Sequence, residues 1–110
     1  MKAYRRIADT GSIYCLDVEP ITGGFHVNGL RNLGVGELPD NAARFHMIEQ
    51  RGQAGANVCV ALIIGPSMAG DSLDWGNAVI GHVKNPRPLL GYLNEYRKSN
   101  PETRQAAAPV

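Results

Sequence analysis

A β-hairpin over residues 12–31 constrains the fold more than any other stretch of this sequence. Two runs rich in β-branched and aromatic residues flank a Thr22-Gly23 turn. Glycine adopts positive φ without steric cost, which a two-residue hairpin loop requires. Closing the chain at this turn predicts a register in which Glu19 lies opposite His26.

The hydrophobic pattern of the hairpin agrees with this register. Side chains alternate between the two faces of a strand, so a slip of one residue would mix apolar and polar positions. The predicted apolar face consists of Tyr14, Leu16, Val18, Phe25 and Val27. The predicted polar face consists of Cys15, Asp17, Glu19, His26 and Asn28.

The composition argues against several classes of protein. With 11 Lys and Arg against 10 Asp and Glu, the net charge of +1 gives little long-range attraction to nucleic acid or to an acidic membrane. The longest apolar run, residues 58–64, is far shorter than the roughly 20 residues that span a bilayer. Two cysteines are too few for a disulfide scaffold, and residues 1–11 lack the apolar core of a signal peptide. We expect a soluble cytoplasmic protein without nucleic-acid or membrane partners.

Local patterns predict the remaining elements. Phe45 and Ile48 fall at helical spacing after Asp40, a residue type that caps helices. Residues 57–64 are apolar throughout, which is typical of a central strand covered on both faces. The expected order is a strand over 2–8, the hairpin, a loop over 32–39, a helix over 40–52, a strand over 57–64, and helices over 71–83 and 88–98.

These elements predict an α+β fold. The strand over 24–31, the helix over 40–52 and the strand over 57–64 form a strand-helix-strand unit, for which a right-handed crossover is the rule. With the hairpin attached, we expect a mixed sheet of three to four strands and two C-terminal helices. A small α/β sandwich is the alternative. The expected organisation is one domain over residues 1–98 and a flexible tail over 99–110.

The polar hairpin face invites a chemical interpretation. A carboxylate opposite an imidazole, as at Glu19 and His26, raises the pKa of the histidine and orients it as a general base. The same pair with a third ligand such as His46 would suit a metal ion. A solvated face with a cross-strand ion pair fits the pattern equally, and we favour it because antiparallel sheets commonly expose one polar face. We therefore expect no metal and no cofactor, and treat Asp17, Glu19, His26 and Asn28 as a candidate binding surface.

Residues 70–77, GDSLDWGN, resemble the first block of the GDSL (SGNH) esterase family. The resemblance implies that Ser72 is a nucleophile at a strand-to-helix turn. The Asp-x-x-His pair of that family does not follow, and His82 is the only histidine downstream. Because helix caps favour aspartate and serine, we interpret Asp71 and Ser72 as a cap and keep a small serine hydrolase as an alternative.

Two glycine-containing loops, 32–39 and 65–71, follow expected strands. Ligands of open α/β sheets bind at such strand ends, so the two loops would line one crevice of a small-ligand binder. Asp71 occupies the place where a phosphate-binding loop has lysine, which argues against nucleotide hydrolysis. The glycines of these loops are Gly34, Gly36, Gly65 and Gly70.

No complete set of nucleophile, base and orienting group emerges from the sequence. We therefore interpret the chain as a small non-enzymatic binding or assembly protein, for example an accessory protein of a bacterium or phage. The expected partner is another protein or a second copy of the chain. Aromatic residues dominate interface hot spots, and the expected anchors are Trp75, Tyr92 and Tyr96.

Overall fold

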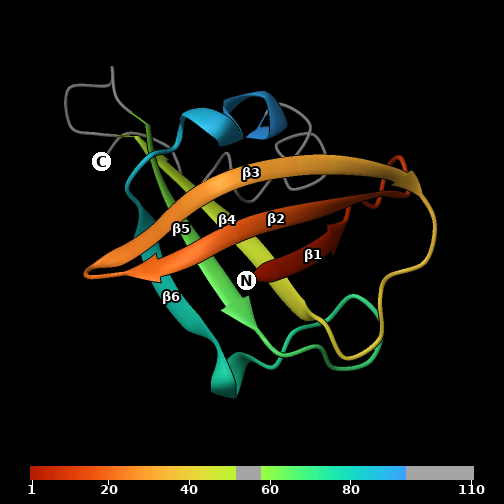
Figure 1. Ribbon diagram of the computed structural model, residues 1–110. Coiled ribbons are helices and arrows are strands. Elements are labelled where there is room, and N and C mark those ends of the chain that lie inside the picture. Colours follow the sequence, from red (N-terminus) through yellow and green to blue (C-terminus); the bar gives the residue numbers. More distant parts are fainter. Residues whose placement is uncertain (52–57, 94–110) are drawn as a thin grey trace.

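The computed structural model describes residues 1–51 and 58–93, which form a closed six-stranded β-barrel (Figure 1). Two short 3-10 turns, η1 (Trp75–Asn77) and η2 (Arg87–Leu89), and one helical turn at 90–93 complete the described part. The strands are β1 (Lys2–Arg6), β2 (Ser12–Ile21), β3 (Gly24–Val35), β4 (Ala43–Arg51), β5 (Val58–Gly65) and β6 (Val79–Val83).

The barrel consists of two antiparallel three-stranded meanders, β1-β2-β3 and β4-β5-β6. They join through two parallel contacts, β1 with β4 and β3 with β6, which give the strand order β1-β2-β3-β6-β5-β4. Each parallel contact is short. Ala3 and Tyr4 pair with residues 43 and 44 at one, and Gly24 and Phe25 pair with residues 82 and 83 at the other.

The predicted hairpin is confirmed. Glu19 lies opposite His26, Val18 lies opposite Val27, and the five residues of the predicted apolar face are all buried in the core. The register shifts between Asp17 and Val18, and the pairing then continues further than expected. Strand β3 therefore extends to Val35, so the predicted loop over 32–39 is wrong in its first half.

Cys15 differs from the other residues of the predicted polar face because it is buried. It lies opposite Tyr4 on β1. The pKa of Tyr4 is raised. The largest cause is a hydrogen bond with the Cys15 side chain, and the next is burial. The outer surface of β2 is thus partly covered where β1 pairs with it.

The predicted apolar strand is also confirmed as β5. Val60, Leu62 and Ile64 point into the core, while Ala61 and Ile63 on the opposite face are buried as well. A strand covered on both faces needs no alternation of apolar and polar residues, which explains the continuous run.

The predicted helix over 40–52 is wrong, because this stretch forms strand β4. Phe45 and Met47 point into the barrel, whereas His46 and Ile48, which alternate with them, are half-buried. The side chains therefore alternate with the period of a strand, and the helical spacing of Phe45 and Ile48 is coincidental. Antiparallel pairing along the whole of β5 overrides the local helix-capping signal.

The predicted helix over 71–83 is wrong as well. The segment consists of a loop, the turn η1 and strand β6, and Asp74 caps η1 in place of the predicted Asp71 or Ser72. Gly81 belongs to the barrel wall, where an added Cβ would lie 3.0 Å from the Phe25 ring. Close packing between strands thus accounts for a glycine that weakens the helix prediction.

The C-terminal segment agrees only in part with the prediction of a helix over 88–98. Leu89 and Leu93 are buried in the core as expected. Tyr96 and the predicted tail over 99–110 lie outside the described residues. The fold is mainly β, and the predicted α+β class with a strand-helix-strand crossover is wrong.

The contact between β3 and β6 gives a direct test of the barrel. A Cβ added to Gly24 would lie 2.1 Å from the carbonyl oxygen of His82, so the strands would have to separate. We expect Gly24→Ala to lower the free energy of unfolding by about 3 kcal/mol, as overpacking does in interiors. Gly29→Ala on the same strand meets no atom within 4 Å and should change it by at most about 0.5 kcal/mol. Urea unfolding of the two variants checks this, and equal stabilities would contradict the β3–β6 contact.

Candidate ligand crevice

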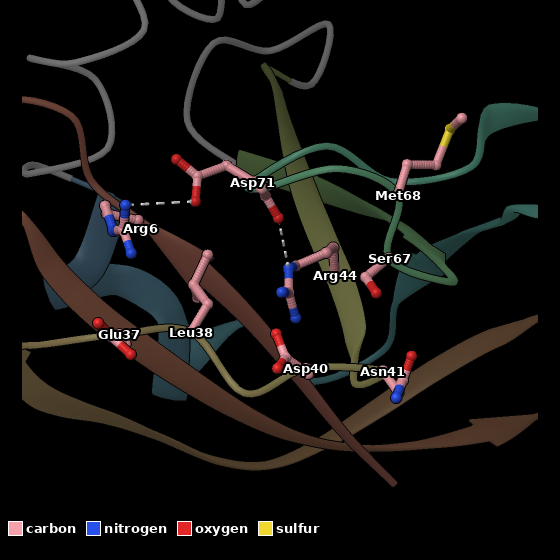
Figure 2. A pocket seen from close by; sticks show the side chains of 10 residues that line it. Arg6, Glu37, Leu38, Asp40, Asn41, Arg44, Ser67, Met68 and Asp71 are labelled. Atoms are coloured by element: carbon pink, nitrogen blue, oxygen red, sulfur yellow. Dashed lines mark hydrogen bonds and ion pairs between the residues drawn. The ribbon is translucent and has the colours of Figure 1, made fainter.

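The described part of the chain contains an open crevice of about 580 Å³ between two loops (Figure 2). One loop, 36–42, connects β3 to β4, and the other, 66–74, follows β5. The residues that line the crevice are Arg6, Glu37, Leu38, Asp40, Asn41, Arg44, Ser67, Met68, Gly70 and Asp71. The structure thus brings together the two regions from which a ligand crevice was predicted, although the fold around them differs.

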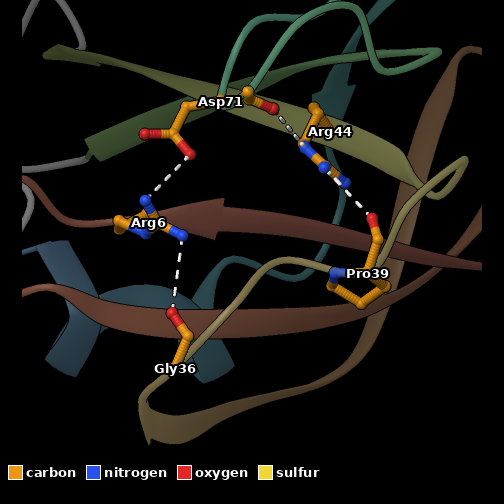
Figure 3. Close-up of polar contacts among 6 residues, drawn as sticks. Arg6, Gly36, Pro39, Arg44 and Asp71 are labelled. Atoms are coloured by element: carbon orange, nitrogen blue, oxygen red, sulfur yellow. Dashed lines mark hydrogen bonds and ion pairs between the residues drawn. The ribbon is translucent and has the colours of Figure 1, made fainter.

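Arg44 is the buried cation of this crevice, with only 4% of its surface exposed. Its guanidinium donates hydrogen bonds to the carbonyl oxygens of Pro39 at 3.1 Å, Ala42 at 3.0 Å and Gly70 at 3.4 Å. The first two acceptors belong to one loop and the third to the other. Arg44 therefore connects both walls of the crevice through their backbones (Figure 3).

Arg6 makes a second link between the loops. It forms an ion pair with Asp71 at 3.8 Å and donates a hydrogen bond to the carbonyl oxygen of Gly36 at 3.4 Å (Figure 3). The side chains of this pair are 35% and 56% exposed. Solvent screens such a surface pair, so its contribution to stability is small.

The crevice carries charges of both signs. Asp71 is engaged by Arg6, whereas no carboxylate of the described residues forms an ion pair with Arg44. The exposed Glu37 and Asp40 lie on the wall formed by loop 36–42. One buried positive charge therefore faces a rim that holds two negative charges.

A smaller cavity of about 370 Å³ adjoins the crevice, and Arg6 and Asp71 line both. Trp75 and His46 form its aromatic part, since their rings stack at 5.4 Å between centroids with 20° between the planes. Arg5 contacts Nδ1 of His46 through its guanidinium. The Arg6–Asp71 ion pair thus separates an aromatic cavity from the charged crevice.

Burial, and then the charge of Arg5, lower the pKa of His46 from 6.5 to about 4. The Arg5 guanidinium lies within hydrogen-bond distance of both ring nitrogens of His46, and arginine can only donate. Ser72 lines the same cavity. A serine nucleophile needs a base that takes its proton, and within the described residues no hydrogen bond joins Ser72 to His46.

The structural context implied by the GDSL resemblance is also missing from the described residues. Ser72 lies in a loop closed by an isolated bridge between Ser67 and Leu73, and no helix begins at it. The backbone N–H of Ser72 donates to the carbonyl oxygen of Ala69 at 3.2 Å. The strand-to-helix turn on which that prediction rested is therefore wrong.

The polar hairpin face is exposed at most of its positions, but within the described residues Glu19 and His26 do not form the expected cross-strand ion pair. Glu19, His26 and Asn28 are exposed, and Asn28 donates a hydrogen bond to Glu19 at 3.3 Å. Asp17 is half-buried and lies 4.0 Å from the N-terminal ammonium group. Among residues 1–51 and 58–93, no group of three or more metal-binding side chains lies together.

The predicted aromatic anchors occupy different environments. Trp75 is 60% exposed, whereas Tyr92 is buried and packs edge-on against Tyr14 at 4.5 Å. Tyr96 lies outside the described residues. Trp75 therefore keeps its predicted surface position, and Tyr92 contributes to the core.

The predicted loop glycines also divide into two groups. Gly70 lines the crevice, and its φ of 61° is a conformation that glycine adopts readily. Gly65 is packed against the backbone of Asp74, and Gly34 belongs to strand β3. Gly36 accepts the hydrogen bond from Arg6 through its carbonyl oxygen.

Sequence reasoning missed Arg6 and Arg44. Arg44 lies between Ala43 and Phe45 in the sequence, and this position beside apolar residues is the one signal for a buried cation. The helix predicted over 40–52 obscured this signal, because it assigned the segment the wrong periodicity.

None of the family models, curated proteins or solved structures with which the chain was compared matches it. The fold and the crevice define it as a small mixed β-barrel with a charged site between two loops. No helix in the described part of the chain is long and apolar enough to cross a membrane.

The lowered pKa of His46 predicts how stability depends on pH. Between pH 6.5 and about 4, the unfolded chain binds a proton at His46 that the folded chain excludes. The contribution of the neutral His46 ring to the free energy of unfolding is therefore complete above pH 6.5 and decreases as the pH falls towards 4. Urea unfolding at several pH values should show that His46→Gln reduces this decrease, whereas His26→Gln at an exposed position should not. An NMR titration of His46 with a midpoint near 6.5 would contradict the prediction.

The backbone contacts of Arg44 predict its contribution to stability. Arg44→Met removes three hydrogen bonds from a charged donor and leaves their carbonyl oxygens without that partner. We expect a loss of about 2–4 kcal/mol in the free energy of unfolding. Arg6→Met, at the exposed ion pair, is the matched control and should cost at most about 1 kcal/mol. Losses of equal size in chemical denaturation would show that Arg44 has no special role.

Proposed function

We propose that this chain is a non-enzymatic binding protein, and that its ligand is a small polar molecule held in the crevice between loops 36–42 and 66–74. The observation that carries the proposal is the convergence of two loops, distant in sequence, on a cavity with a buried guanidinium. Its volume lies within the range of about 300–1,000 Å³ that is usual for small-molecule sites.

The way in which the loops are held supports a binding role. Arg44 contacts carbonyl oxygens on both walls and Arg6 links the same walls from strand β1. These polar contacts fix the distance between the two loops, and the space between the loops stays open to solvent. A site formed in advance loses less conformational entropy when a ligand binds.

The chemistry of the adjoining cavity favours binding over hydrolysis. His46 stacks on Trp75, and burial and the charge of Arg5 lower its pKa to about 4, so the ring is neutral at pH 7 and lies against the Arg5 guanidinium. A hydrolase requires a base that is hydrogen-bonded to its serine, and no such bond joins Ser72 to His46 among the described residues.

The cellular location and an alternative partner of the protein are proposed on separate observations. We propose a cytoplasmic protein, which the buried free thiol of Cys15 supports because reduced cysteines are typical of that compartment. Association with a protein partner or with a second copy is the alternative binding role. The exposed side chains of Trp75, Val79 and Ile80 support that alternative.

Filling the crevice tests the proposal. A mixed set of amino acids, nucleosides, sugars and dicarboxylates is screened by saturation-transfer NMR against the natural chain and Ser67→Trp, whose new side chain would occupy the cavity. Thr22→Trp adds the same side chain at the exposed hairpin turn, at the other end of the molecule (Figure 1). We expect signals that Ser67→Trp abolishes and Thr22→Trp retains. Signals that survive in both variants would place binding elsewhere, and a complete absence of signals would count against a small-molecule site.

A further inference from the structure

We propose that the ligand of this crevice is a small dipolar ion with one carboxylate and one ammonium group, of which a free α-amino acid is the simplest example. The inference rests on the proposed function, since it assigns a chemical class to the ligand of the same site. It follows from which charged groups of the crevice already form an ion pair within the protein and which do not.

Arg44 supplies the position for the carboxylate. Its three hydrogen bonds to the loops all go to neutral carbonyl oxygens, and a guanidinium has more N–H donors than these three use. Burial removes water from a charge at a considerable cost, which a carboxylate offsets better than carbonyl dipoles do. Figure 2 shows the guanidinium of Arg44 pointing into the space between the two loops.

Glu37 and Asp40 supply the position for the ammonium group. Both are exposed, both line the crevice, and neither forms an ion pair within the described part of the chain. Asp71 differs because Arg6 already lies 3.8 Å from it. Two carboxylates without a partner therefore remain beside one buried cation.

This arrangement disfavours ligands with a single charge. A simple anion would meet Arg44 but would be repelled by the carboxylates of Glu37 and Asp40. A simple cation would meet those carboxylates but would leave the buried guanidinium uncompensated. A dipolar ion satisfies both, and Leu38 and Met68 provide apolar surface for its side chain.

The test uses the full-length chain labelled with ¹⁵N and the standard L-amino acids as probes, each at about 10 mM to detect millimolar affinity. We expect at least one to shift the backbone amide signals of loops 36–42 and 66–74. That amino acid is then compared with its N-acetyl derivative, which lacks the ammonium group, and with its carboxamide, which lacks the carboxylate. Each derivative should bind at least about tenfold more weakly, which corresponds to about 1.4 kcal/mol.

A variant distinguishes recognition from a structural effect. Asp40→Asn should weaken binding of the amino acid about tenfold and leave that of its N-acetyl derivative unchanged, because only the former presents a cation to Asp40. Glu19→Gln, the same change of charge on the distant hairpin face, is the matched control and should alter neither.

The outcomes separate this inference from the proposed function. Equal binding of the amino acid and both derivatives in the crevice would overturn the dipolar ligand and leave small-molecule binding intact. A lack of any shift in the two loops with every amino acid would also overturn it, while the wider screen with Ser67→Trp decides the proposed function independently. An equal effect of Asp40→Asn on the amino acid and on its N-acetyl derivative would show that Asp40 acts on the loop and does not recognise the ligand.

Discussion

The short parallel pairing of β1 with β4 is the contact on which both the barrel and its crevice depend. Ala3 and Tyr4 pair with Ala43 and Arg44, so the middle of β1 lies alongside the start of β4. This places Arg6 and Arg44 at the same end of the barrel, where loops 36–42 and 66–74 also meet. Only two residue pairs hold the two strands together. The polar contacts of the arginines with the loops therefore reinforce the place where the first meander joins the second.

Local signals in the sequence were sufficient where they agreed with the long-range pairing. The Thr22-Gly23 turn and the alternation around it predicted the hairpin, and the unbroken apolar run predicted β5. Strand β4 could not be predicted in this way, because Phe45 and Ile48 satisfy a helical period by chance and Asp40 resembles a cap. Pairing with β5 along nearly the whole of β4 and with the distant β1 overrides this helical pattern.

The candidate site, like the fold, could be predicted from the sequence only in part. Parts of the two predicted loops, 32–39 and 65–71, line the crevice, although β3 runs to Val35 and only Gly70 of their four named glycines lines it. The arginines that define the chemistry could not be recognised, because their proximity arises from the closure of the barrel. The polar hairpin face had the more conspicuous sequence pattern, yet its residues are solvated and contact one another weakly. A row of polar residues on one strand is thus a poorer guide to the position of a site than a single buried charge such as Arg44.

The half-buried His46 and the buried Arg44, two basic groups near this end of the barrel, are accommodated in opposite ways. His46 avoids a buried charge by staying neutral, since burial and Arg5 lower its pKa to about 4. Arg44 cannot lose its proton, so the protein surrounds it with backbone carbonyl oxygens from both loops. The guanidinium is thereby fixed in position before any ligand arrives, and a ligand that binds its remaining donors would not have to order the loops. Because a fixed charge needs little reorganisation when a partner binds, the same contacts that stabilise the loops also prepare the crevice for a carboxylate.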